Sequence, residues 1–144
     1  MGSLFIGHSD FWPKLKLPFF SESVSAGFPS PANDYIDRTL DLNELCIKHP
    51  AATFFVRVSG DSMTGAGIYP GDILVVDRAL NAMQGDIVIA CVDGEFTLKE
   101  LALKPTPRLL PRNPAYRPIL IPEGGELEIF GVVTGMVRQF ERSR

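Results

Sequence analysis

Two side chains in this sequence, Ser62 and Lys99, could together cleave a peptide bond. Ser62 lies in a glycine-rich turn, VSGDSMTGAG (residues 58–67), which can present a hydroxyl beside backbone N–H groups. The hydroxyl needs a general base, and a neutral lysine amine can take its proton. A lysine with the ordinary pKa of about 10.4 is neutral in only about one molecule in 10³ at pH 7. Catalysis would therefore require burial to lower the pKa of Lys99 to roughly 7.

Each of the two residues also has a simpler interpretation. A serine beside Gly and Asp is typical of an ordinary turn. The segment EFTLKELAL (residues 95–103) alternates as a strand does, with Thr97 and Lys99 on one face, but Lys99 could equally be an exposed lysine paired with Glu95 or Glu100. The chain has only two histidines, at positions 8 and 49, and we expect both at the surface, so a Ser–His pair is not favoured.

No other motif in the sequence suggests chemistry. There is no phosphate-binding glycine loop, no spaced carboxylate pair and no metal-ligand spacing, so we expect neither a cofactor nor a metal. Cys46 and Cys91 lie in apolar surroundings without a ligand pattern, which favours two buried, reduced thiols and a cytoplasmic location.

The composition predicts a folded chain with little direct affinity for DNA. The length of 144 residues suits one hydrophobic core, and the net charge of −3 gives no broad basic surface. No apolar run reaches the roughly 18 residues that a membrane helix needs, and the first residues do not form a secretory signal, so no membrane association is expected.

The elements that must position Ser62 and Lys99 are mainly strands. Residues 1–35 are rich in Pro, Gly and Ser without a sustained period and predict an extended N-terminal arm, whose apolar residues should lie on a surface. Residues 41–49 predict one short helix capped by Asp41. Residues 36–144 should form a β-rich domain, a compact curved antiparallel sheet or barrel. The predicted strands are 53–59, 72–77, 86–92, 95–103, 108–111, 117–121 and 127–140.

Several segments together resemble one family. The segments VSGDSM (58–63), GDILVVD (71–77) and EFTLK (95–99) are similar to the LexA/UmuD self-cleaving peptidases, including the separation of the serine and the lysine. The resemblance extends to SAGFPSPA (25–32), which is similar to the family's cleavage segment, and to FGVVT (130–134). It covers almost the whole chain. Only 26 residues precede the expected scissile bond, too few for a helix-turn-helix domain, so the chain resembles UmuD more than LexA.

This resemblance implies a mechanism and a set of partners. Ser62 would be the nucleophile and Lys99 the base, backbone N–H groups of Asp61 and Ser62 would form the oxyanion site, and cleavage would fall between Ala26 and Gly27. It further implies a homodimer and an SOS-response role in which RecA–single-stranded DNA filaments stimulate cleavage. The truncated product would join a UmuC-like Y-family polymerase in translesion synthesis.

Two other functions share parts of this pattern. The first is a nonenzymatic polymerase-accessory or checkpoint protein with a vestigial peptidase site. The second is a signal-peptidase-like enzyme, which would use the same Ser–Lys chemistry but would require a membrane anchor. Substitution of Ser62 or Lys99 separates the self-cleaving peptidase from the accessory protein.

Overall fold

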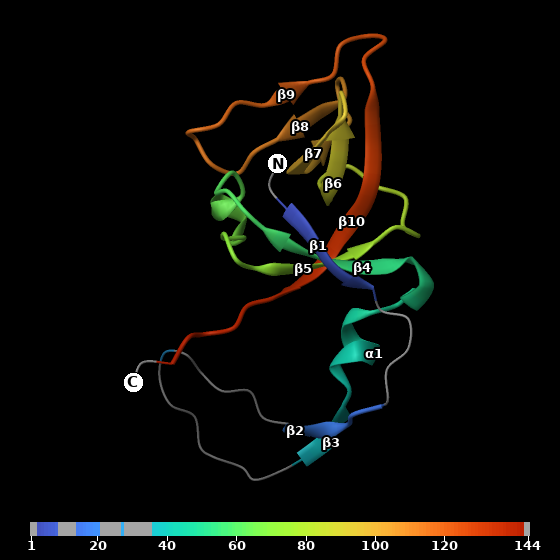
Figure 1. Cartoon of the computed structure of the whole chain (residues 1–144), viewed down its shortest axis with the longest axis vertical. Coiled ribbons are helices and arrows are strands. Elements are labelled where there is room, and N and C mark those ends of the chain that lie inside the picture. The colour runs from blue at the N-terminus through green and yellow to red at the C-terminus, as the bar shows by residue number, and fades with distance from the viewer. Residues whose placement is uncertain (1–2, 9–13, 21–26, 28–35, 143–144) are drawn as a thin grey trace.

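The computed structural model describes residues 3–8, 14–20, 27 and 36–142. Their main feature is an eight-stranded antiparallel sheet in the order β1-β4-β5-β10-β6-β7-β8-β9, accompanied by a two-stranded sheet of β2 and β3 (Figure 1). The strands are β1 (Ser3–His8), β2 (Leu17–Phe20), β3 (Ile36–Leu40), β4 (Thr53–Val58), β5 (Ile73–Asp77), β6 (Ile87–Val92), β7 (Glu95–Ala102), β8 (Arg108–Leu110), β9 (Ile119–Leu120) and β10 (Leu127–Val137). The helices are α1 (Leu42–Cys46) and the 3-10 turns Pro50–Ala52 and Thr64–Ala66.

The long strand β10 joins the two halves of the main sheet. Its first part pairs with β6 and its second part with β5, so β10 crosses from the β6–β9 half to the β1–β4–β5 half (Figure 1). The register shifts between Ile129 and Gly131, near the change of partner. A Cβ at Gly131 would lie 2.5 Å from Val76 Cγ1, so only glycine allows β10 to approach β5 this closely.

Apolar side chains form two buried clusters in this sheet. One contains Phe54, Val56, Val58, Met63, Ile68, Leu74, Val76, Ile89 and Leu98, and the other contains Val88, Ala90, Leu101, Leu109 and Val132. Because Leu98 and Leu101 of β7 belong to different clusters, β7 is packed on both sides. The prediction of a mainly β, antiparallel fold is confirmed. The sheet remains open, with β1 and β9 at its edges, rather than closing into a barrel.

All seven strands predicted from residue 53 onward are present, with ends shifted by a few residues. The predicted helix is present but shorter than 41–49. Asp41 caps α1 as expected, its side chain accepting a hydrogen bond from the Asn43 N–H at 2.9 Å. Leu42 and Leu45 of α1 are 63% and 52% exposed, so the helix does not bury its apolar face against the described residues.

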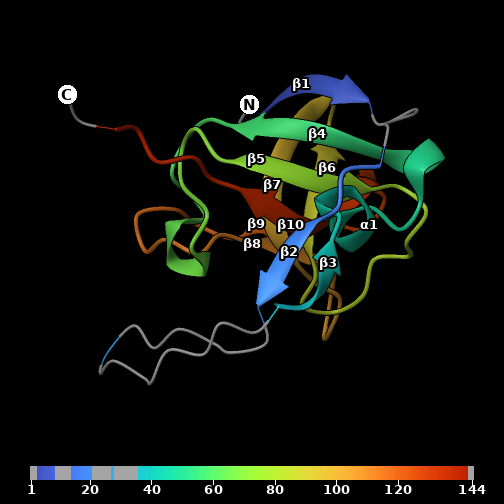
Figure 2. The ribbon, with the colours of Figure 1, turned by 90° about the horizontal axis from the view of Figure 1, so that it is seen from below.

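The N-terminal segment contains more regular structure than the sequence pattern indicated. β1 pairs with β4 along one edge of the main sheet, as Figure 2 shows, and β2 pairs with β3. β2 belongs to the predicted arm and β3 to the predicted domain, so these hydrogen bonds connect the two parts across residue 35. Such pairing depends on contacts between distant segments, which local composition does not reveal.

Two smaller predictions have mixed outcomes. The glycines of both Gly-Asp pairs, Gly71 and Gly85, have φ of +94° and +90° and form turns as expected. Cys46 and Cys91 are unpaired, but both are half-buried, so the expectation of fully buried thiols was wrong.

Candidate active site

Ser62 lies in the turn that follows β4. Gly60, with φ of +84°, lets the chain leave the strand sharply, and Met63, only 1% exposed, anchors the turn in the core. The 3-10 turn Thr64–Ala66 follows directly. These contacts hold the half-buried Ser62 on a short, well-anchored loop.

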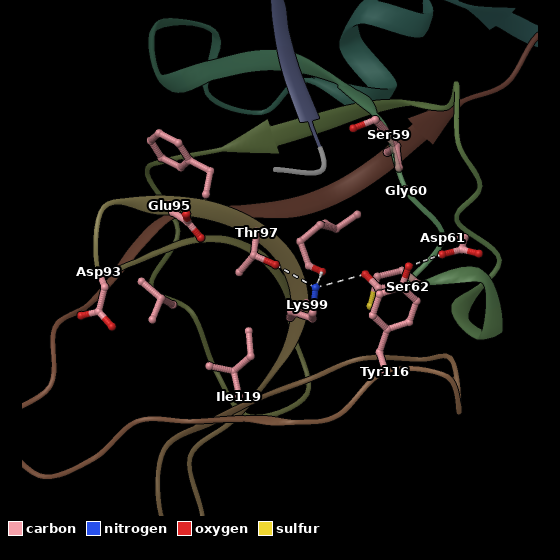
Figure 3. A pocket seen from close by; sticks show the side chains of 15 residues that line it. Ser59, Gly60, Asp61, Ser62, Asp93, Glu95, Thr97, Lys99, Tyr116 and Ile119 are labelled. Atoms are coloured by element: carbon pink, nitrogen blue, oxygen red, sulfur yellow. Dashed lines mark hydrogen bonds between the residues drawn. The ribbon is translucent and has the colours of Figure 1, made fainter.

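Lys99 comes from the middle of β7, which pairs with β6 on one side and β8 on the other. Its side chain turns toward Ser62, and Nζ donates a hydrogen bond to Ser62 Oγ at 3.1 Å (Figure 3). Nζ also donates to Thr97 Oγ1 at 2.7 Å and to the Leu98 carbonyl at 3.1 Å. Residues 37 positions apart in the sequence are thus in direct contact.

The surroundings of Lys99 favour a neutral amine. Lys99 is only 8% exposed, and loss of solvation on burial lowers its pKa below the ordinary lysine value. Its hydrogen-bond partners are all neutral oxygens, whereas Glu100 is paired with Arg112. The alternative of an exposed lysine in an ion pair was wrong. A neutral amine has two hydrogens, which Thr97 Oγ1 and the Leu98 carbonyl can accept, and its lone pair can then accept the Ser62 hydroxyl proton.

Backbone donors lie beside the Ser62 hydroxyl. Within the described part of the chain, the backbone N–H groups of Asp61 and Ser62 donate no hydrogen bond. Backbone N–H groups left free next to a nucleophile can stabilise the negative oxygen that forms when a carbonyl is attacked.

The loop of residues 111–118 supports the Ser62 turn, a role that the local sequence does not indicate. The Arg112 N–H donates to the Ser62 carbonyl at 2.8 Å, and Asn113 Nδ2 donates to the Asp61 carbonyl at 2.8 Å. The Tyr116 hydroxyl donates to Asp61 Oδ1, and this bond raises the pKa of Tyr116. The Asn-Pro turn signal at 113–114 marked a loop, but nothing local indicated which turn it would contact.

Replacing Gly65 by alanine should disturb this support. Gly65 N–H donates to the Arg112 carbonyl at 2.6 Å, and a Cβ at Gly65 would lie 2.4 Å from that same oxygen. We expect Gly65→Ala to lower the free energy of unfolding by about 1–3 kcal/mol, the usual range for overpacking. Denaturant unfolding measures this, with Gly135→Ala as the control, because the nearest atom there is 4.0 Å away. Equal stability of the two variants would contradict the expectation.

Ser62 and Lys99 share a cleft of about 620 Å³. Its apolar walls include Val58, Met63, Leu98 and Ile119, and the side chains of Asp93 and Glu95 lie at the β6–β7 turn beside it (Figure 3). The size and the mixture of apolar and polar walls suit a short peptide segment.

Of the predicted cleavage site, only Gly27 is among the described residues. Ala26 lies outside the described residues, and Gly27 is exposed and does not line the cleft. His49 Nδ1 lies 2.6 Å from Asp77 Oδ2, likewise away from Ser62. Among the described side chains that line the cleft there is no histidine, so Lys99 is the base candidate there.

The described part of the chain holds neither a metal-binding cluster nor a membrane-spanning helix. Among the described residues, no three His, Cys, Asp or Glu side chains gather in a way that could hold a metal ion. No helix in the described ranges has the length and apolar character to cross a bilayer.

Comparison with known proteins identifies the family. Residues 18–134 match the model described as Peptidase S24-like. Protein SamA of Salmonella typhimurium is 61% identical over 122 residues, 85% of each chain, and protein MucA of Escherichia coli is 50% identical over 119 residues, 82% of each chain. The LexA repressor of Alcanivorax borkumensis is 38% identical over 89% of this chain and 62% of the repressor. The chain is a member of the Peptidase S24-like family, and its resemblance to the LexA/UmuD proteins is confirmed.

Proposed function

We propose that this protein is a serine endopeptidase that cleaves its own chain between Ala26 and Gly27. The observation that carries the proposal is the contact of 3.1 Å between Lys99 Nζ and Ser62 Oγ at a buried lysine. Membership of a family that includes self-cleaving serine peptidases supports the same chemistry.

In the proposed reaction, Lys99 first accepts a proton from Ser62 and then donates it to the leaving Gly27 nitrogen. Neutral Lys99 takes the Ser62 hydroxyl proton while Oγ attacks the Ala26 carbonyl carbon, and the N–H groups of Asp61 and Ser62 bind the developing oxyanion. Lys99 then donates its proton to the Gly27 nitrogen, which leaves as the new N-terminus. Water, deprotonated by Lys99, attacks the ester between Ala26 and Ser62. Lys99 then returns the proton to the departing Ser62 Oγ, which frees the Ala26 carboxylate and restores the enzyme.

The cleavage segment must move to reach the dyad. Gly27 lies outside the cleft, and with β3, α1 and β4 in place the nine residues from Gly27 to Ile36 could span at most roughly 30 Å if extended. Attack within one chain and attack on a second copy are both compatible with the proposed chemistry. Ala26 and Gly27 suit a narrow site because neither has a bulky side chain, and glycine tolerates a strongly bent backbone.

Because the cleavage segment must dock at Ser62 and Lys99 before it is cut, a partner that favours docking can control the cleavage rate. A RecA–single-stranded DNA filament that favours the docked conformation would raise the cleavage rate without adding a catalytic group. In this proposal the protein is a cytoplasmic homodimer of the SOS response, and its product, residues 27–144, is the accessory subunit of a UmuC-like Y-family polymerase. The similarity to SamA and MucA supports this setting at the level of the family.

Mass spectrometry tests the proposal directly. After incubation of the purified protein with RecA, nucleotide and single-stranded DNA, we expect two new masses, those of residues 1–26 and 27–144. Omitting the single-stranded DNA should strongly reduce both. An intact chain after prolonged incubation, at neutral and at alkaline pH, would contradict self-cleavage.

A further inference from the structure

One ion pair links the strand that carries Lys99 to the loop that supports Ser62. Arg112 donates from Nε to Glu100 Oε1 at 2.9 Å and makes a second, shorter bond to the same oxygen from Nη2. Glu100 directly follows Lys99 on β7, so the guanidinium contact is anchored one residue away from the amine. Arg112 thereby reaches β7 through its side chain.

The backbone of the same residue reaches the nucleophile. The Arg112 N–H donates to the Ser62 carbonyl at 2.8 Å, and the Arg112 carbonyl accepts from Gly65 N–H at 2.6 Å. The two backbone bonds bracket the turn on either side of Met63, which is itself buried. One residue is thus bonded to both elements that carry the dyad.

The register of the sheet explains this geometry. Glu100 pairs with Leu110 of β8, and Arg112 follows Leu110 by two positions. Diagonal neighbours on adjacent antiparallel strands lie within reach of long side chains. Glu100 and Lys99 alternate on β7, so the carboxylate binds Arg112 while the amine turns to Ser62.

We propose that Arg112, held by Glu100, is a positioning residue that sets the distance between Ser62 Oγ and Lys99 Nζ. This inference rests on the proposed self-cleavage, because it concerns the geometry of that reaction. A displacement of about 1 Å at reacting atoms can lower a rate by up to about 10²-fold. Since the Arg112 backbone bonds persist in a side-chain variant, we expect a smaller loss, roughly tenfold, in Arg112→Ala.

The test measures self-cleavage without RecA across a pH series. Positioning predicts that Arg112→Ala and Glu100→Gln both lower the plateau rate at alkaline pH roughly tenfold. It also predicts that the double variant is no slower than either single variant, because both remove the same contact. Arg112→Lys should recover part of the rate. Arg117→Ala, which removes an exposed positive charge from the same loop, should keep the wild-type plateau.

A purely electrostatic role of the pair gives a different result. Losing the negative Glu100 would move the midpoint of the pH profile down, and losing the positive Arg112 would move it up, with unchanged plateaus. Wild-type plateaus in both single variants would overturn the inference while leaving self-cleavage intact. An uncleaved wild-type chain would instead refute the proposed function. The Arg112 side chain is 51% exposed but the Glu100 side chain is only 16% exposed, so a thermal melt of each variant checks that the chain remains folded at the assay temperature.

Discussion

Ser62→Ala and Lys99→Met should each abolish release of residues 1–26. Ser62→Ala removes the attacking oxygen, and Lys99→Met removes the only amine within hydrogen-bonding distance of that oxygen in the described structure. Loss of a nucleophile or its base lowers the rate of serine peptidases by at least about 10³-fold. Mass spectrometry of each variant, incubated at alkaline pH and separately with the RecA filament, measures the effect. Both variants should remain folded, since methionine fills the volume of the lysine stem without a buried amine.

Lys104→Ala is the matched control, because Lys104 is an exposed lysine close to the end of β7. It should cleave at the wild-type rate. If the Ser62→Ala chain still released the fragment, a contaminating peptidase would be responsible and the assignment of the nucleophile would fail. If the wild-type chain were inert but still bound a polymerase, the nonenzymatic accessory function would be favoured.

Cleavage should accelerate with rising pH. Lys99 must be neutral to accept a proton, and the neutral fraction increases about tenfold per pH unit below its pKa. Burial lowers the pKa of Lys99, so the rate should level off below the ordinary lysine pKa of about 10.4. The initial rate of fragment release, measured from pH 6 to pH 11 without a filament, gives the profile.

The same shift has a consequence for stability with a definite sign. The unfolded chain binds a proton at this lysine up to about pH 10.4, whereas the folded chain loses it at lower pH. Protonated Lys99 therefore lowers the free energy of unfolding at pH values below its pKa in the folded chain. This destabilisation disappears as the pH rises from that pKa to about 10.4, the pKa in the unfolded chain. Lys99→Met should be more stable than the wild type at pH 7, by an amount that shrinks toward pH 10.4. A cleavage rate independent of pH, or a wild-type stability advantage at pH 7, would contradict a desolvated amine.

The strands beyond residue 53 could be predicted because their pattern is local. Alternation in β7 and short apolar runs such as Ile87–Val92, bounded by glycine turns, indicate strands without knowledge of their partners. β1 and β2 could not be predicted in this way. Their segments contain Gly7 and Pro18, which local propensity disfavours in strands, and they are held by hydrogen bonds to β4 and β3.

For the site, the sequence supplied the chemistry but not the contacts. Ser62 and Lys99 were candidates from residue type, a turn and a family resemblance, yet each had a simpler interpretation. Their contact depends on the packing of β5, β10 and β6, which lie between β4 and β7 in the sheet. The supporting roles of Arg112 and Tyr116 depend on hydrogen bonds across about fifty positions, which no local pattern encodes.

Because β1 pairs with β4, the proposed cleavage would change which strand forms this edge of the sheet. A break after Ala26 would sever β1 and β2 from the rest of the chain, leaving β1 attached only as a bound peptide. When that peptide dissociated, β4 would become the outermost strand, with a row of backbone N–H and C=O groups open to solvent. Exposed strand edges of this kind pair readily with another extended chain. Cleavage and loss of β1 would then leave the β4 edge of the sheet open to pairing with a strand of another chain.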